Sequence, residues 1–308
     1  MDQFSNHPLY RRHSLDSAMN SFLEFYKKKF PVLFITSFVM SVVIQYASTL
    51  INLEEFSAIT DPMVMLGKLT NLIVPVLVVS VINLFCTTIL QYYIIYNPLD
   101  SGNTIFVSAL KSLKYFIPYL ILMVLLALAG SLAMILGILV LVIGVIFSLL
   151  YIMTIYLFIL PIMMVEGTNI ANTISRTITL AHRNFWSNIG WVAVFVIILI
   201  VVSVILSGII LLPFAGSFLK IIINPGASSE LLNLAKNPLF IILSALTSAL
   251  TLPVMPILGC ILYFNGKAGE ETGRMVSRAD PEIDRVRVED LYAKPYSDDH
   301  PDNPENKV

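Results

Sequence analysis

Residues 115–165 form a run of 51 residues without a charged side chain, between Lys114 and Glu166. A membrane-spanning helix needs about 20 apolar residues. A single helix of this length would extend about 75 Å at 1.5 Å per residue, far beyond the thickness of a bilayer. The run therefore predicts two spans that fold back on each other as a hairpin.

The turn of this hairpin is expected where glycines interrupt the run. Gly130, Gly137 and Gly144 recur every seven residues, and we place the turn between Gly130 and Gly144, with spans of about 115–137 and 139–165. Small residues also let helix backbones approach closely in lipid, so the glycines indicate a tight seam between the two helices. A loose turn with ordinary membrane glycines explains the spacing equally well, and both interpretations stay open.

Other parts of the chain also have the length and composition of membrane spans. Four more apolar blocks lie at about 31–51, 72–96, 190–212 and 239–263. Only 13% of the residues are charged, about half of the ~25% typical of a soluble domain. The predicted fold is therefore an all-α polytopic membrane protein with six transmembrane helices.

This count divides the chain into three parts. We expect an N-terminal cytoplasmic tail at 1–13, a six-helix membrane domain at 14–265, and a polar, largely disordered cytoplasmic tail at 266–308. Pro253 and Pro256 lie inside the last span and should kink it, because proline removes a helical hydrogen bond and clashes with the preceding turn.

The distribution of basic residues predicts the orientation of the spans. Lys and Arg collect in short cytoplasmic loops. With the N-terminus inside, the cytoplasmic segments hold 16 of the 19 basic residues, and the outer loops hold only Lys68, Lys220 and Lys236. Both termini are therefore predicted to be cytoplasmic, in a bacterial inner membrane.

Three segments that precede the odd-numbered spans resemble one another, at residues 19–30, 105–116 and 174–185. In each segment, a second apolar residue lies four positions after the first apolar residue. A basic residue lies nine positions after that first residue, and a phenylalanine lies eleven positions after it. In the third copy the apolar residues follow helical spacing, at Ile170, Ile174, Ile178, Ala181 and Phe185. Such an amphipathic helix can lie in the membrane interface. The pattern predicts three units, each a cytoplasmic interfacial helix followed by a transmembrane hairpin.

Basic residues of these segments are candidate contacts for lipid headgroups: Lys28, Lys114, Arg176 and Arg183. A plainer interpretation is that they only set the orientation of the spans.

Asn83 and Gln91 are the candidate polar contacts within the membrane. They lie eight residues apart on the second span. They are expected either to line one polar cavity or, as the favoured interpretation, to form hydrogen bonds between helices.

Part of the chain resembles a known membrane domain. Residues 160–167, followed by 174–180 and 184–186, are similar to the membrane domain that accompanies some bacterial glycerophosphodiester phosphodiesterases and also occurs alone in multi-pass proteins. In that pattern a proline-containing span leads to an acidic residue and glycine, an amphipathic helix, and Phe-Trp. Thr177 stands where serine is usual, and the end of the last span, 263–265, resembles stand-alone members. The resemblance implies a multi-pass fold and little about function.

No catalytic site, metal site or cofactor is expected. The motifs for zinc, phosphate-loop or nucleophilic chemistry are absent, and the histidines are scattered at His7, His13, His182 and His300. A third, least favoured hypothesis is a membrane-embedded enzyme, based on Glu166, Arg176, His182 and Arg183, which are expected to cluster at the interface. The acidic residues around His300 lie in a polar tail that we expect to be solvated. Cys86 and Cys260 fall in apolar stretches and are expected to be buried.

The leading functional hypothesis is a non-enzymatic membrane protein, a scaffold or accessory subunit that engages phospholipids. A protein partner could bind the mixed-charge C-terminal tail, and no basic domain suggests nucleic acid. The alternative is a transporter or lipid-translocating protein, since transporters are often built from repeats.

Overall fold

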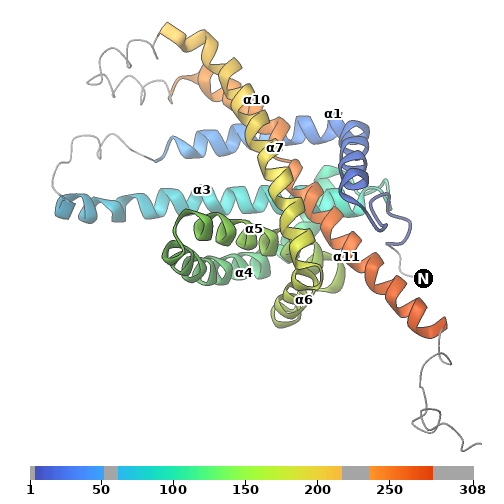
Figure 1. Cartoon of the computed structure of the whole chain (residues 1–308). Helices are drawn as coiled ribbons and strands as arrows, with labels where there is room; N and C mark the ends of the chain where they lie inside the picture. The colour runs from blue at the N-terminus through green and yellow to red at the C-terminus, as the bar shows by residue number, and fades with distance from the viewer. Residues whose placement is uncertain (1–3, 52–61, 217–235, 280–308) are drawn as a thin grey trace, which may run out of the picture. The chain divides into compact units, whose positions relative to one another are not determined.

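The computed structural model describes residues 4–51, 62–216 and 236–279, which are helical and contain no strand. The elements, in chain order, are α1 (Leu15–Ser48), α3 (Pro62–Tyr96), α4 (Ile105–Leu139), α5 (Leu141–Glu166), α6 (Ile170–Arg183), α7 (Phe185–Leu211), the short 3₁₀ helix η1 (Leu212–Phe214), α10 (Pro238–Thr251) and α11 (Val254–Ala279) (Figure 1). The chain divides into two compact units, residues 1–268 and 269–308.

Six stretches of the described residues are long and apolar enough to cross a membrane, which confirms the predicted number of candidate spans. They are Leu15–Ser48, Leu69–Tyr96, Ile105–Leu139, Leu141–Glu166, Phe185–Ile210 and Pro238–Thr272. Most are longer than predicted, because helix continues into the polar sequence beside each apolar block.

Side-chain caps determine where three of the helices begin. Ser14, Thr104 and Asn169 cap α1, α4 and α6, and each accepts a hydrogen bond from the backbone amide three residues later, at 3.0 to 3.4 Å. Segments 19–30 and 105–116 therefore lie inside α1 and α4, continuous with the spans that follow. Only the third of the similar segments forms a helix of its own, α6.

The isoleucines of the predicted apolar face of α6 lie on its exposed side, and smaller side chains pack against the protein. Ile174 and Ile178 are 38% and 49% exposed. The residues that α6 buries are Thr173, Thr177, Leu180 and Ala181. Small threonine and alanine side chains allow a close approach between helices, so the longer isoleucines lie at the edge of the contact. Helical spacing identified the helix, but it could not show which side packs.

The turn between α4 and α5 is a single residue, Val140, inside the predicted interval. Leu141 follows with φ 62°, a conformation that non-glycine residues rarely adopt. A Cβ on Gly137 would lie 2.8 Å from the carbonyl oxygen of Gly144, and Ser148 Oγ donates to the Ala133 carbonyl at 3.0 Å. The glycines thus lie in a close approach of the two helices, as the tight-seam interpretation expects.

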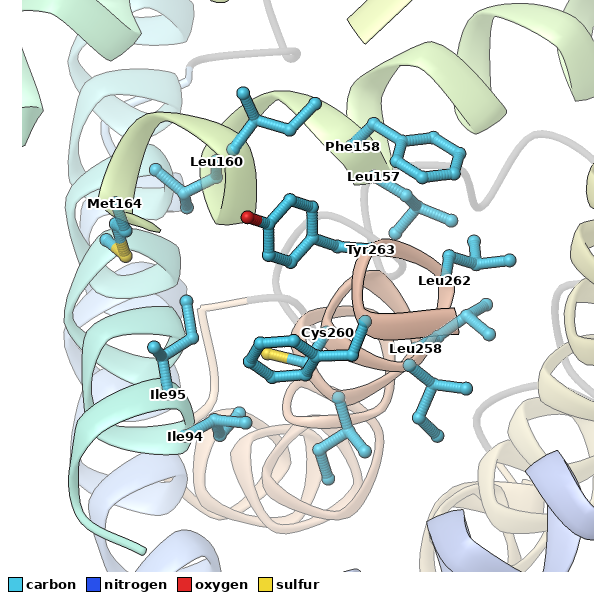
Figure 2. Packing of buried hydrophobic residues seen from close by; sticks show 14 of the residues in the cluster. Ile94, Ile95, Leu157, Phe158, Leu160, Met164, Leu258, Cys260, Leu262 and Tyr263 are labelled. Carbon is cyan, nitrogen blue, oxygen red and sulfur yellow. The ribbon is translucent and has the colours of Figure 1, made fainter. Parts of the chain in front are cut away.

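Burial is concentrated toward one end of each long helix. In α3, buried residues begin at Cys86, and in α5 an unbroken buried stretch runs over residues 157–164. These parts pack around α11, and Figure 2 shows Leu157, Leu160 and Met164 of α5 beside Cys260 and Tyr263 of α11. The other ends expose their apolar side chains, as at Val74 of α3 and Ile143 of α5. Such exposed apolar surface requires lipid or another protein to cover it.

The sixth candidate span is interrupted at Pro253, inside the region where a kink is predicted. α10 ends at Thr251 and α11 begins at Val254, because Pro253 has no amide hydrogen to continue the helix. The Leu250 carbonyl beside the break accepts a hydrogen bond from the Tyr26 hydroxyl at 2.9 Å. A side chain of α1 therefore satisfies a backbone group at this break.

Both predicted tails contain ordered structure. Phe4 and Leu9 are 3% and 1% exposed and belong to the core, so residues 4–13 are not a free tail. At the other end, α11 continues to Ala279, past the predicted boundary at 266, because alanine, lysine and glutamate after that point favour helix. The predicted disorder of residues 280–308 lies outside the described residues.

Replacing Gly259 by alanine should destabilise the packing of α11 on α5. A Cβ at this position would lie 2.8 Å from the Leu157 carbonyl oxygen, so one backbone must shift, which costs about 1–3 kcal/mol in an overpacked core. We expect Gly259→Ala to lower the Tm in detergent by several degrees. Gly208→Ala is the matched control, because a Cβ at Gly208 has no atom within 4 Å. Equal Tm values for the two variants would contradict this packing.

Candidate functional site

A basic pocket of about 700 Å³ lies between the N-terminal segment, α1 and the loop after α3. Among its described lining residues are three cations, Arg11, Lys28 and Lys29, and one carboxylate, Glu24. The remaining lining residues are Asn6, Pro8, Leu9, Ser21, Phe25, Asn97, Pro98, Leu99 and Ser101. The pocket therefore carries two more positive than negative charges and suits an anionic group.

The N-terminal segment, residues 4–13, forms one wall of this pocket because hydrogen bonds anchor it to the core. The Leu9 amide donates to His7 Nδ1 at 3.1 Å, so Nδ1 is unprotonated. His7 Nε2 must then carry the proton, and it donates to the Ile94 carbonyl of α3 at 3.1 Å. Further along, the His13 amide donates to Asn265 Oδ1 of α11 at 2.8 Å.

His7 is held in its neutral form by its surroundings. Its ring lies 4.7 Å from the ring of Phe264 and 6.3 Å from that of Phe25, measured between centroids, and the residue is 2% exposed. Burial disfavours the charged imidazolium and lowers the pKa of His7 from 6.5 to about 4, although the hydrogen bond to Ile94 acts in the opposite direction.

Two of the three cations are held by protein groups. Lys29 Nζ donates to Asn97 Oδ1 at 2.7 Å, and the Arg11 guanidinium donates to Ser21 Oγ. Lys28 is exposed and forms no hydrogen bond or ion pair with any other residue in the described part of the chain. Arg11 and Lys29 therefore have defined positions, whereas the Lys28 ammonium is available to a ligand.

A second polar pocket of about 490 Å³ adjoins the first and shares Asn6, Pro98 and Leu99 with it. Lys111 Nζ donates to Asn103 Oδ1 at 2.8 Å, and Asn103 Nδ2 donates to Asp100 Oδ2 at 3.0 Å. This chain of contacts balances one cation with one carboxylate. An anion should therefore prefer the basic pocket.

Arg176, predicted to contact headgroups, is instead paired within the protein. Its Nε and second guanidinium nitrogen donate to the two carboxylate oxygens of Glu166 at 2.7 and 3.1 Å. The Tyr263 hydroxyl also donates to Glu166, at 3.1 Å. A bidentate pair of this kind is among the stronger ionic contacts, and together with Tyr263 it connects α5, α6 and α11 and neutralises the charge of Arg176.

The four predicted headgroup contacts lie at four different places. Lys28 lines the basic pocket, and Arg176 is paired with Glu166. Lys114 is exposed, with its Nζ 4.6 Å from the centre of the Tyr115 ring, and Arg183 is exposed at the end of α6. Of these four, Lys28 alone lies in the basic pocket.

Asn83 and Gln91 do not share a cavity. Gln91 is 3% exposed, and its Nε2 donates to Cys260 Sγ of α11 at 2.9 Å, which fits the interpretation of hydrogen bonds between helices. Asn83 is exposed on the outer surface of α3. Eight residues turn a helix by about 80° beyond two full turns, enough to separate the two side chains. Cys86 and Cys260 are buried free thiols, as expected.

The structure also separates Glu166 from His182. His182 lies near the C-terminal end of α6, where its Nε2 is 3.3 Å from the Tyr151 hydroxyl and its Nδ1 is 2.8 Å from the Ile178 carbonyl oxygen. Within the described residues, no three His, Cys, Asp or Glu side chains are grouped closely enough to hold a metal ion. The acidic residues around His300 lie outside the described residues.

Sequence reasoning placed Arg11 and Lys29 among the cytoplasmic cations, but it did not identify them as parts of a site, and it treated His7 as scattered. The apolar residues Phe4 and Leu9 on either side of His7 were the available signal that this segment is buried. No spacing rule connects His7 with Ile94, 87 residues later.

Comparisons with known proteins add no relative, because no family model, curated protein or solved structure matches the chain.

Acidification should release the N-terminal segment. Because the folded pKa of His7 lies near 4, below its unfolded value of 6.5, its contribution is present above pH 6.5 and is lost as the pH falls toward 4. Between pH 7 and pH 5 the loss is about 2 kcal/mol. Hydrogen exchange of residues 4–13 should therefore accelerate at pH 5, after correction for the intrinsic rate. In His7→Gln the acceleration at pH 5 should be smaller than in the unaltered protein. If the variant keeps the full acceleration, the pH dependence arises from another group, such as His13.

Proposed function

We propose that this chain is a non-enzymatic integral membrane protein, a scaffold or accessory subunit that binds anionic phospholipid headgroups at the cytoplasmic face. The observation that carries the proposal is the basic pocket, where Arg11, Lys28 and Lys29 face a single carboxylate. A phosphate group would accept hydrogen bonds from Lys28, while Arg11 and Lys29 supply positive charge from fixed positions. Cations close to an anionic membrane surface contribute about 1 kcal/mol each.

The proposed topology has both termini in the cytoplasm and three transmembrane hairpins, each preceded by an interfacial amphipathic segment. The excess of basic residues on one side supports it. The separate helix α6 and the polar beginnings of α1 and α4 are consistent with this scheme. We further propose a bacterial inner membrane and a relationship to the membrane domain of glycerophosphodiester phosphodiesterases, on the residues quoted above. A partner protein would bind the mixed-charge tail at 280–308.

A transporter or lipid-translocating protein is the second candidate. It is favoured by the break in the sixth candidate span at Pro253, because interrupted helices frequently form the binding sites of transporters. The large apolar surfaces beyond the packed ends of the helices are equally compatible with both candidates.

Neutralising the basic pocket should weaken binding of anionic lipid. We expect Lys28→Gln and Arg11→Gln each to reduce the affinity for phosphatidylglycerol about fivefold, as a loss of about 1 kcal/mol predicts, with little effect on phosphatidylcholine. Native mass spectrometry of the protein released from nanodiscs of defined composition measures both. Lys27→Gln is the matched control, because Lys27 is an exposed neighbour that does not line the pocket. Equal losses of affinity for Lys27→Gln and Lys28→Gln would show that the effect comes from general surface charge. That result would contradict binding in the basic pocket.

The proposed topology has its own test. A membrane-impermeant maleimide applied to intact spheroplasts should label Ser57→Cys, in the predicted outer loop, and should leave Ser101→Cys, in the loop after α3, unlabelled until the membrane is permeabilised. The opposite pattern would invert the orientation and place the basic pocket outside.

A further inference from the structure

An apolar cavity, separate from both polar pockets described above, lies between α4, α5 and α6. Its volume is about 410 Å³, within the range of small-molecule sites. From α4 it is lined by Leu122, Leu125, Leu126, Ala129, Gly130 and Ala133; from α5 by Tyr151, Ile152, Ile155 and Ile159; and from α6 by Ile174, Thr177 and Ile178. We call it the α4–α6 groove. Its α4 residues cover about 17 Å of helix at 1.5 Å per residue, so the groove suits an elongated apolar ligand.

One polar group in this lining lacks a partner. Thr177 is 1% exposed, and its hydroxyl has no hydrogen-bond partner among the described residues. Buried hydroxyls are nearly always paired, so an unpaired one calls for an explanation. Thr177 also lines the groove, so its side chain borders the space that a bound molecule would occupy.

The surroundings of the groove indicate which molecule is available. Toward the turn, α4 and α5 expose apolar side chains such as Leu136 and Ile143, at 64% and 79%, which is the kind of surface that lipid covers. On α6, Arg183 is an exposed cation, and no carboxylate occurs between Glu166 and Glu230. The groove thus joins an apolar surface to a helix whose charge complements a phosphate.

We propose that the α4–α6 groove binds one acyl chain of a membrane glycerophospholipid, whose ester carbonyl accepts a hydrogen bond from the Thr177 hydroxyl. The phosphate of this lipid then lies toward Arg183, at the C-terminal end of α6. A bound lipid would give the buried Thr177 hydroxyl a partner and would cover Ile174 and Ile178, which line the cavity.

The inference deepens the proposed function and depends on it only in requiring that the chain lies in a membrane. The α4–α6 groove and the basic pocket have no lining residue in common. A failure of one site therefore leaves the other measurable, with Lys28→Gln reporting on the basic pocket and Thr177→Val on the groove.

The test uses the full chain in nanodiscs containing phosphatidylglycerol with a photoreactive diazirine in one acyl chain. Crosslinked peptides are mapped by mass spectrometry, and retained phospholipid is counted after transfer to detergent. Ala129→Trp fills the groove, and Ala127→Trp is its matched control, because Ala127 is exposed on α4 outside the lining. Thr177→Val removes the hydroxyl, and Thr179→Val is the control, since Thr179 is exposed and donates to the Ser175 carbonyl.

The expected result is crosslinking to the α4 and α5 residues of the groove, reduced at least fivefold in Ala129→Trp and retained in Ala127→Trp. Phospholipid retention should fall severalfold in Thr177→Val, with an unchanged or raised Tm, and remain in Thr179→Val. Unchanged crosslinking in Ala129→Trp, or an equal loss in Ala127→Trp, would overturn the proposal. Unchanged retention in Thr177→Val would overturn the role of the hydroxyl. Lys28→Gln should leave the groove crosslinks intact.

Discussion

The packing around α11 is the interaction on which the rest of the first unit depends. Residues 257–264 are buried without interruption, and each neighbour contacts them in a different way. The backbone of α5 approaches at Gly259, Tyr263 donates to the carboxylate that also holds α6, and the ring of Phe264 lies against His7. Because the glycine admits no side chain and the carboxylate has three donors, this end of the structure tolerates few rearrangements.

The two candidate binding sites differ in their relation to this packed end. The basic pocket is built directly on it, since the wall at residues 4–13 is anchored through His7 and His13. Its fixed cations thus acquire their positions from the core. The α4–α6 groove lies where α4 and α5 leave the core and become apolar on their outer surfaces. One site suits a headgroup at a rigid surface, and the other suits a chain at the boundary with lipid.

Hydropathy and charge predicted the features that depend on local composition, and they missed those that depend on side-chain direction. The 51-residue uncharged run predicted a turn, and the turn lies at Val140. Helical spacing predicted an apolar face of α6 toward the membrane, but it did not predict that Thr173 and Thr177 are buried against the protein, where their small size allows close packing. The rotation of a helix over eight residues is enough to predict that Asn83 and Gln91 point in different directions. The contact between His7 and Ile94, by contrast, has no local signature in the sequence.

The hydrogen bond between the His13 amide and Asn265 joins residues 252 positions apart. During synthesis residues 4–13 are made long before the residues of α11 that they contact. A contact between residues this far apart forms late, because the chain between the two residues must be in place before they can meet. The anchor at His13 can therefore form only after α11 has been synthesised, whereas the anchor between His7 and α3 can form earlier, so the wall of the basic pocket is completed in two steps.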